Sequence, residues 1–190
     1  MTAIQIVSLG LLALFYAVYL GKMIAQRRRG IRTDVLGVAG KPKRERMIEA
    51  TLKVMTYSTV AVEAGSIVWG RSFLPKVCAW CGVAVTAVGV AFFVAAVLTM
   101  RDSWRAGISP EEKTELVTGG VYEISRNPAF VGFDLTYIGL CLSFANALNI
   151  AFALVTMILF HLQILQEEKF LLSRQDIDYA SYMHRVRRYL

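Results

Sequence analysis

The chain of 190 residues has only three cysteines. Two of them, Cys78 and Cys81, form a C-x-x-C pair, but a structural zinc site needs four ligands and the sequence has no second pair. A redox-active C-x-x-C motif is typical of a thioredoxin-like βαβ setting, which is also missing. We therefore expect Cys78, Cys81 and Cys141 to be buried in helices, without a metal and without a disulfide framework.

Charged residues are also scarce, at 18% of the chain, whereas hydrophobic residues make up 56%. Soluble domains contain about 25% charged residues, so this composition argues against a soluble fold. The formal net charge is +7, but no polar segment is long enough to form a separate nucleic-acid-binding module. The composition instead indicates an integral membrane protein whose basic residues face anionic lipid headgroups.

The hydrophobic segments predict an all-α, polytopic fold with about five transmembrane helices. A spanning helix needs about 20 mostly apolar residues. Residues 4–24 and 77–100 meet this length, and residues 131–165 suffice for two short spans with a turn near 143–146. Residues 54–69 are a weaker candidate because they contain Glu63, and four spans are the alternative if this segment lies on the membrane surface. Since no basic residues precede the first segment, we interpret it as a retained anchor rather than a signal peptide.

Basic residues predict the orientation of these spans. They cluster in residues 26–46 and again in residues 185–188. The positive-inside rule places both segments in the cytoplasm and the N-terminus outside. Residues 101–127 then lie in the cytoplasm as well. We expect the membrane to be a bacterial or archaeal inner membrane or that of the endoplasmic reticulum.

Two helices are predicted outside the spans. One begins with Ser109 as N-cap, Pro110 at the first helical position and acidic residues in the first turn. The other covers residues 176–187, where Tyr179 and Tyr182 share one face.

Small residues recur at a spacing of seven within two predicted spans. They are Gly82 and Gly89 in one span and Gly132 and Gly139 in another. Such residues allow helix backbones to approach closely, either within the chain or in a homodimer.

Polar residues lie at both ends of the C-terminal hairpin. Arg126 to Phe130 precede its first span, and Glu167 and Glu168 follow its second. Arg126 supplies a fork of donors, Asn127 can donate and accept, and a helix that begins at Pro128 leaves backbone N–H groups free. Two adjacent carboxylates at a helix C-terminus oppose its dipole unless a ligand compensates. A ligand with a sugar diol and a cationic sulfonium would match these groups.

These residues resemble the signature of the isoprenylcysteine carboxyl methyltransferase and phospholipid methyltransferase superfamily. That signature contains Arg-His-Pro, an aromatic residue and a later Glu-Glu pair, here residues 126–130 with 167–168. The resemblance extends from Thr118 to the tail at residues 185–188. It implies that the C-terminal half binds S-adenosylmethionine on the cytoplasmic side, releases S-adenosylhomocysteine, and receives a lipophilic acceptor from the bilayer.

The resemblance also implies that Tyr122, Arg126, Asn127, Pro128 and Phe130 line the cofactor pocket together with Glu167 and Glu168. Helical spacing adds His161 as a cofactor-binding candidate, because it lies seven residues before Glu168 on nearly the same face. Arg126 and Asp134 are the expected catalytic residues, and Asp134 is chosen because it is ionisable within a predicted span, one turn after Phe130. Two positions depart from the family, which has His at position 127 and Tyr at position 130. Asparagine cannot titrate, which argues against a base at position 127.

Simpler interpretations remain open for several of these residues. Arg126 fits a membrane-surface anchor, and Asp134 fits either a substrate-orienting group or a partner of Arg126. His161 fits a hydrogen-bonded residue between helices as well as a ligand contact. Glu168 is better explained as a solvated charge at a helix end, and the two tyrosines of residues 176–187 as interfacial aromatics.

The sequence thus predicts a membrane methyltransferase. Residues 1–100 are expected to form the helices that shape a tunnel for the acceptor, and residues 101–190 the cofactor-binding region. The acceptor is a prenylated cysteine carboxylate, a lipid amine or a thiol. A membrane NADPH-dependent reductase of the sterol-reductase type and a non-catalytic membrane scaffold are the alternative interpretations.

Overall fold

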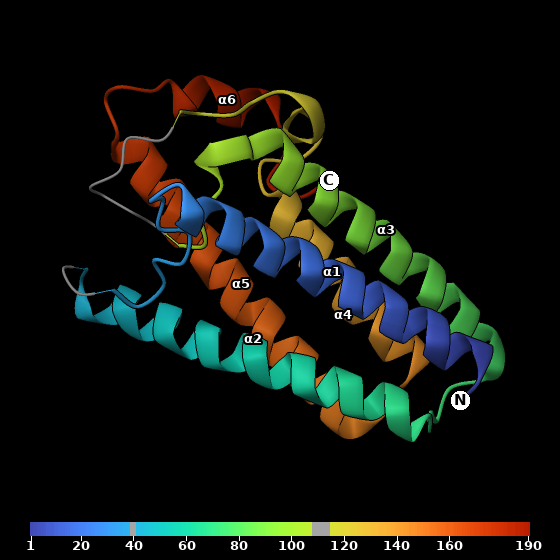
Figure 1. Cartoon of the computed structure of the whole chain (residues 1–190). Coiled ribbons are helices and arrows are strands. Elements are labelled where there is room, and N and C mark those ends of the chain that lie inside the picture. The colour runs from blue at the N-terminus through green and yellow to red at the C-terminus, as the bar shows by residue number, and fades with distance from the viewer. Residues whose placement is uncertain (39–40, 108–114) are drawn as a thin grey trace.

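The computed structural model describes residues 1–38, 41–107 and 115–190, and the protein is mainly helical (Figure 1). The described residues form six α-helices and two short 3₁₀ helices. The α-helices are α1 (Ala3–Arg28), α2 (Lys43–Trp69), α3 (Lys76–Met100), α4 (Pro128–Ser143), α5 (Ala147–Ser173) and α6 (Tyr179–Arg185). The 3₁₀ helices are η1 (Arg101–Ser103) and η2 (Gly120–Glu123). The expected all-α fold is confirmed in this part of the chain.

Three of the helices are long and apolar enough to cross a membrane. They are α1, α3 together with η1, and α5. Helix α4 is apolar but has only 16 residues, and α2 begins with a charged segment. The predicted total of about five spans therefore stays a prediction, although each expected apolar segment is helical.

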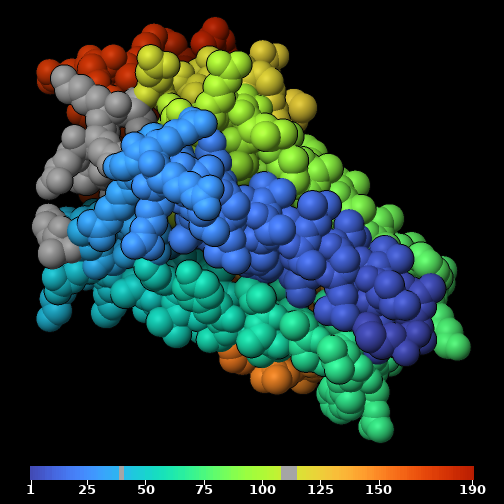
Figure 2. All heavy atoms as spheres, in the orientation of Figure 1, coloured from blue at the N-terminus to red at the C-terminus, as the bar shows by residue number. Residues whose placement is uncertain are grey.

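The long helices pack in neighbouring pairs (Figure 1). Helix α3 lies along α4, α2 lies along α5, and α1 packs against α3. In the space-filling view, α1 and α2 cover one face of the bundle, and part of α5 emerges beyond α2 (Figure 2). This arrangement encloses the inner faces of α4 and α5.

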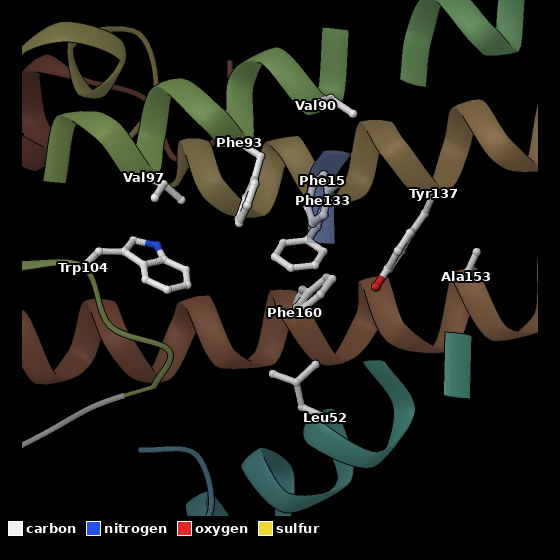
Figure 3. Close-up of a cluster of buried hydrophobic side chains, with 10 residues drawn as sticks. All are labelled: Phe15, Leu52, Val90, Phe93, Val97, Trp104, Phe133, Tyr137, Ala153 and Phe160. Carbon is white, nitrogen blue, oxygen red and sulfur yellow. The ribbon is translucent and has the colours of Figure 1, made fainter. Parts of the chain in front are cut away.

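The centre of the bundle is an aromatic cluster drawn from different helices (Figure 3). The ring centroids of Phe15 on α1 and Phe93 on α3 are 4.1 Å apart. The Phe133 ring on α4 lies 4.7 Å from Phe15 and 4.9 Å from Phe160 on α5. Aromatic pairs of this kind contribute about 0.5–1.5 kcal/mol each beyond the area they bury. The cluster therefore fixes four helices against one another.

Glycines bring the backbones of α3 and α4 into contact. A Cβ atom added to Gly89 would lie 2.6 Å from the backbone nitrogen of Thr136, and one added to Gly132 would lie 2.7 Å from that of Phe93. Gly82 and Gly139 are equally crowded by the facing helix. The predicted close approach is confirmed within the chain.

A tight turn joins α4 to α5. Helix α4 ends at Ser143, and α5 begins at Ala147 with Asn146 as its N-cap, whose side chain accepts a hydrogen bond from the backbone of Asn149. The turn occurs where the sequence predicted it. Because the chain reverses here, the start of α4 and the end of α5 lie at the same end of the bundle.

Other local expectations had mixed outcomes. Cys81 is exposed and Cys78 is only half-buried, so the expectation that both are buried is wrong. The helix expected over residues 176–187 is shorter and covers only α6, with Asp178 as its N-cap. The helix start expected at Ser109 lies outside the described residues.

The α3–α4 contact makes a matched pair of glycine substitutions informative. Gly89→Ala should lower the unfolding temperature in detergent, because overpacking of this kind costs about 1–3 kcal/mol. Gly10→Ala in α1 is the control, since a Cβ there meets nothing within 4 Å. That substitution should be neutral or stabilise by up to about 1 kcal/mol. Equal thermal stability of the two variants would contradict the backbone contact.

Candidate active site

The chain enters α4 through residues that bind the C-terminal tail. Pro128 occupies the first turn of α4, where its missing N–H is not needed. Asn127, at the N-cap position, donates from Nδ2 to the backbone carbonyl of Arg188 over 3.1 Å. The hydroxyl of Ser125 donates to the same carbonyl over 3.3 Å. The tail is thus held against the start of α4.

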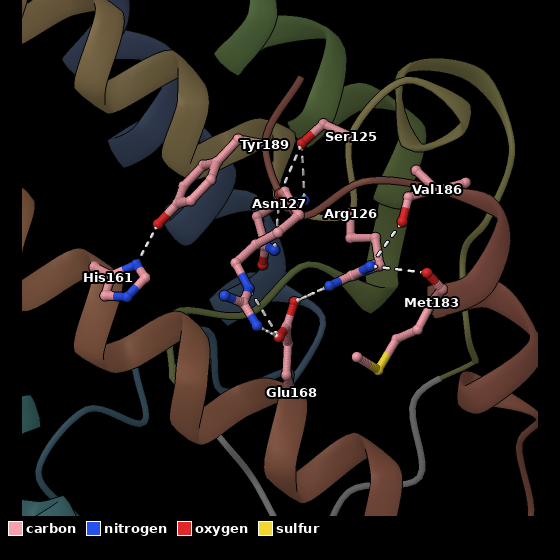
Figure 4. Close-up of polar contacts among 9 residues, drawn as sticks. Ser125, Arg126, Asn127, His161, Glu168, Met183, Val186 and Tyr189 are labelled. Atoms are coloured by element: carbon pink, nitrogen blue, oxygen red, sulfur yellow. Dashed lines mark hydrogen bonds and ion pairs between the residues drawn. The ribbon is translucent and has the colours of Figure 1, made fainter.

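Two ion pairs that share the Glu168 carboxylate hold the same region together (Figure 4). Glu168, near the end of α5, accepts from Arg126 Nη2 over 2.8 Å through one carboxylate oxygen and from Arg188 Nη2 over 2.7 Å through the other. Glu168 is only 4% exposed. The interpretation of Glu168 as a solvated helix-end charge is therefore wrong, since two arginines balance the carboxylate that the helix dipole disfavours.

Arg126 also binds the tail through its remaining donors. Its Nη1 donates to the carbonyls of Met183 and Val186 over 3.1 Å and 2.7 Å, and its backbone N–H donates to the carbonyl of Arg187. The Arg126 side chain is buried, which argues against a membrane-surface anchor. Because protein acceptors occupy the guanidinium, the geometry favours a positioning role for Arg126; the catalytic role stays a prediction.

Two tyrosines of the tail lie inside the protein. Tyr179 and Tyr182 are both 3% exposed, so the expectation of interfacial aromatics is wrong. The Tyr182 hydroxyl donates to the carbonyl of Tyr122 over 2.6 Å. Burial raises the pKa of both tail tyrosines to about 12, so they are neutral hydrogen-bonding groups at physiological pH.

A cavity of about 140 Å³ lies beneath the tail and α6. We call it the tail-side cavity. Seven of the predicted site residues line it: Tyr122, Arg126, Asn127, Pro128, Phe130, Glu167 and Glu168. Trp104, Tyr179 and Tyr182 also line it. The two ends of the hairpin therefore converge on one space, as the sequence suggested.

A second, apolar cavity of about 270 Å³ lies between α1, α2, α4 and α5. Its walls include Leu20, Leu52, Val60, Phe133 and Phe160. The two cavities share four lining residues: Arg105, Ala129, Phe130 and Glu167. A polar space and an apolar space therefore adjoin at these side chains.

Glu167 lies at this boundary and is positioned by a neutral amide. Gln163, one turn earlier on α5, donates from Nε2 to Glu167 over 2.9 Å. The same Nε2 lies 3.5 Å from Glu49 of α2, which is paired with Lys41 over 2.6 Å. Glu167 thus faces both cavities while Lys41 neutralises the neighbouring Glu49.

Two predicted residues lie away from the cavities. Among the described residues, neither Asp134 nor His161 lines either space. His161 Nδ1 is 2.5 Å from the hydroxyl of Tyr189 and lies between α5 and the tail. Arg126 pairs with Glu168 rather than with Asp134, so the proposed Arg126–Asp134 pair is wrong. The ligand contact of His161 and the catalytic role of Asp134 stay predictions.

Sequence reasoning missed several residues of the site. Arg188 was interpreted only as part of a basic tail, and Ser125 and Trp104 gave no recognisable signal. Gln163 was detectable in principle, because it precedes Glu167 by one helical turn. The contact with Glu49 was not, since these residues lie on helices far apart in the sequence.

These features describe a helical membrane protein with a polar and an apolar cavity that meet near one end of the bundle. A family model for phospholipid methyltransferases matches residues 77–175. The chain belongs to this phospholipid methyltransferase family. The matched region runs from α3 to the end of α5 and therefore contains both ends of the hairpin.

A plant protein is also similar in sequence. It is protein-S-isoprenylcysteine O-methyltransferase B of Arabidopsis thaliana, 39% identical over 77 residues. The similar segment makes up 38% of this chain and 39% of the plant protein, so the chain spans about two fifths of the relative's length. The apolar helices and the family together make this an integral membrane protein.

The ion pair of Glu168 predicts that this residue holds the tail in place. Glu168→Ala should expose the tail to trypsin, because removing one partner of a buried ion pair costs about 3–5 kcal/mol. We expect cleavage after Arg185, Arg187 and Arg188 to become several-fold faster. Glu167→Ala is the matched control and should leave the cleavage rate unchanged. Equal rates in both variants would show that the ion pair does not fasten the tail.

Proposed function

We propose that the protein transfers a methyl group from S-adenosylmethionine to a lipophilic acceptor that partitions into the membrane. The observation that carries the proposal is the pair of cavities that adjoin at Ala129, Phe130 and Glu167. One space suits a polar nucleoside-bearing donor, and the other suits an apolar acceptor. Membership of the phospholipid methyltransferase family supports the same chemistry.

The residues of the tail-side cavity fit such a donor. Glu167 offers its carboxyl oxygens to a ribose diol or to the cationic end of the ligand, and Gln163, a neutral amide, holds it in place. The aromatic rings of Trp104, Tyr122 and Tyr179 offer stacking surfaces and favour a nearby cation. Asn127, with a donor and an acceptor, suits a nucleobase or the carboxylate of the ligand.

Methyl transfer mainly requires the protein to position the donor and the acceptor. When bound, S-adenosylmethionine would supply an activated sulfonium methyl, which the acceptor attacks in line while the bond from sulfur to the methyl group breaks and S-adenosylhomocysteine leaves. Ala129 and Phe130 would exclude water from the boundary of the cavities, and Glu167 would orient the ligand there. A base is needed only if the acceptor must lose a proton, and a carboxylate or thiolate acceptor is already ionised. This matches Asn127, which cannot titrate.

The apolar cavity supports a lipophilic acceptor. The plant relative is named for an S-isoprenylcysteine substrate, and an isoprenoid chain would suit walls made of Leu52, Phe133 and Phe160. A prenylated cysteine carboxylate, a lipid amine or an apolar thiol each combines a nucleophile with such a chain. Helices α1 and α2 contribute much of the cavity wall, in agreement with an acceptor role for residues 1–100. Residues 101–190 supply most of the tail-side cavity.

The same proposal includes an orientation in the membrane. The end of α1, the start of α2 and the tail all lie at the end of the bundle that contains the tail-side cavity (Figure 1). These segments contain most of the basic residues, so the positive-inside rule favours a cytoplasmic donor site. The glycines that suggested a homodimer pack between α3 and α4 within the chain, so their spacing no longer supports a dimer.

Calorimetry on the detergent-solubilised protein tests the choice of cofactor. We expect S-adenosylmethionine and S-adenosylhomocysteine to bind and NADPH not to bind. Binding of NADPH alone would instead indicate a reductase. Failure of all three ligands to bind would leave the non-catalytic scaffold as the better explanation.

Glu167 is the residue on which donor binding should depend most. Glu167→Ala should weaken S-adenosylhomocysteine binding by about 10- to 100-fold, the usual effect of losing one or two hydrogen bonds to a charged group. The unfolding temperature should change little, since within the described part of the chain Glu167 accepts a hydrogen bond from Gln163 alone. Unchanged affinity would remove Glu167 from the donor site.

The apolar cavity can be filled without touching the donor site. Thr56→Trp should raise KM for the lipophilic acceptor by about tenfold or more, because the indole would occupy space that the substrate needs. S-adenosylhomocysteine affinity should stay at the wild-type level. Val54→Trp is the control, since Val54 is 64% exposed on the outer face of the same helix. Equal KM values for the two variants would show that the acceptor binds elsewhere.

A further inference from the structure

Three polar groups lie near one another inside the bundle, and their buried oxygens have no hydrogen-bond partner of good geometry among the described residues. They are Tyr16 on α1, Glu63 on α2 and Tyr137 on α4. Both carboxyl oxygens of Glu63 are unpartnered, and Glu63 is fully buried. Glu63 interacts electrostatically with both tyrosine hydroxyls, and the hydroxyls of Tyr16 and Tyr137 face each other as a weak hydrogen-bonding pair. We call these three residues the Tyr–Glu cluster.

The cluster lies at the inner end of the apolar cavity. Tyr16 lines the cavity directly. Glu63 follows the lining residue Val60 by three positions, and Tyr137 follows Phe133 by four, so each lies about one helical turn, or about 5 Å, deeper. The Tyr137 side chain extends from α4 toward α5 beside the Phe160 ring (Figure 3).

The opposite end of the cavity is the boundary at Phe130 and Glu167. On α4, Phe130 and Tyr137 are seven residues apart, which corresponds to about 10 Å along the helix. On α5, which runs back toward the boundary, the lining residue Phe160 lies seven residues before Glu167 and is therefore equally far inward. The Tyr–Glu cluster, of which Tyr16 lines the cavity, therefore lies about 10 Å from the end at which the two cavities meet.

Hydrogen bonding within the protein does not explain why Glu63 is buried in the cluster. Thr59 and Thr156, on the two helices that flank the cavity, form a hydrogen bond of 2.8 Å and satisfy each other. Glu63 lies one turn from Thr59 on the same helix and receives no such partner. Polar groups that are left unpaired in a membrane interior are costly, and ionisable ones there are typically functional. A purely hydrocarbon occupant of the cavity would leave the Glu63 carboxyl unpaired among the described residues.

We propose that the acceptor carries a second polar group, a hydroxyl, about 10 Å from the atom that receives the methyl group, and that Tyr16, Glu63 and Tyr137 bind it. A hydroxyl both donates and accepts, so it can donate to the Glu63 carboxyl and accept from a tyrosine. It is neutral and can enter from the bilayer more readily than an ammonium group. This inference rests on the proposed function, which defines the reacting end of the cavity.

Two matched probes test the inference. They are N-acetyl-S-geranyl-L-cysteine and its analogue with a hydroxyl on carbon 4 of the geranyl chain, where the spacing from the carboxylate matches the proposed one. The full-length protein in lipid nanodiscs would be saturated with S-adenosylhomocysteine, and the dissociation constant of each probe measured by calorimetry. We expect the hydroxylated probe to bind about tenfold tighter or better, because a site built for a hydroxyl discriminates against an analogue that lacks it.

Substitutions assign this preference to the cluster. Glu63→Leu and Tyr16→Phe should each bring the ratio of the two dissociation constants toward unity. Glu63→Gln should keep most of the preference, because an amide still hydrogen-bonds a hydroxyl. Thr59→Val is the matched control on the same helix and should keep the wild-type ratio. The unfolding temperature of Glu63→Leu should be unchanged or higher, since the lost carboxyl has no partner in the described part of the protein.

Several results would overturn the inference. These are equal affinity of the wild-type protein for both probes, binding of neither probe, a preference that survives both Glu63→Leu and Tyr16→Phe, or a large fall in the unfolding temperature of Glu63→Leu. Failure of the proposed function is distinguishable, because S-adenosylhomocysteine would then not bind the wild-type protein. Binding of S-adenosylhomocysteine without any probe preference would refute only the second polar group.

Discussion

The site depends on the two ion pairs of Glu168, which lies near the end of α5. One ion pair, with Arg126, joins α5 to the start of α4, and the other, with Arg188, joins α5 to the tail. Two cations make a carboxylate tolerable at the C-terminal end of a helix, where the dipole opposes it. The tail that is held in this way brings Tyr179 and Tyr182 over the space beneath it. Without these ion pairs the tail-side cavity would lose its outer wall.

The helical bundle gives these ion pairs a rigid base. Glycines let the backbones of α3 and α4 touch, and the aromatic cluster around Phe133 fixes α1, α3, α4 and α5 together. The start of α4 therefore cannot shift independently of the bundle. The apolar cavity lies inside this bundle and meets the tail-side cavity at Glu167. A lipophilic molecule and a polar one can thus approach each other while each stays in a medium that suits it.

Hydrophobic segment length and turn chemistry predicted much of the fold. The helices, the turn before Asn146, the close approach of Gly89 and Gly132, and the convergence of residues 126–130 with Glu167 followed from local patterns. Burial of Glu168 did not, because its partners are 42 and 20 residues away along the chain. The basic tail residues suited a topology signal equally well, which hid the role of Arg188. The apolar cavity depends on α1 and α2, whose packing no local motif predicts.

The account is tested most directly by an experimental structure of the protein with S-adenosylhomocysteine bound. The nucleoside should lie in the tail-side cavity, with the thioether sulfur directed toward the boundary formed by Ala129, Phe130 and Glu167. A lipophilic acceptor in the apolar cavity would then face the position of the missing methyl group. A nucleoside bound outside this cavity, or a sulfur atom directed away from the apolar cavity, would contradict the account.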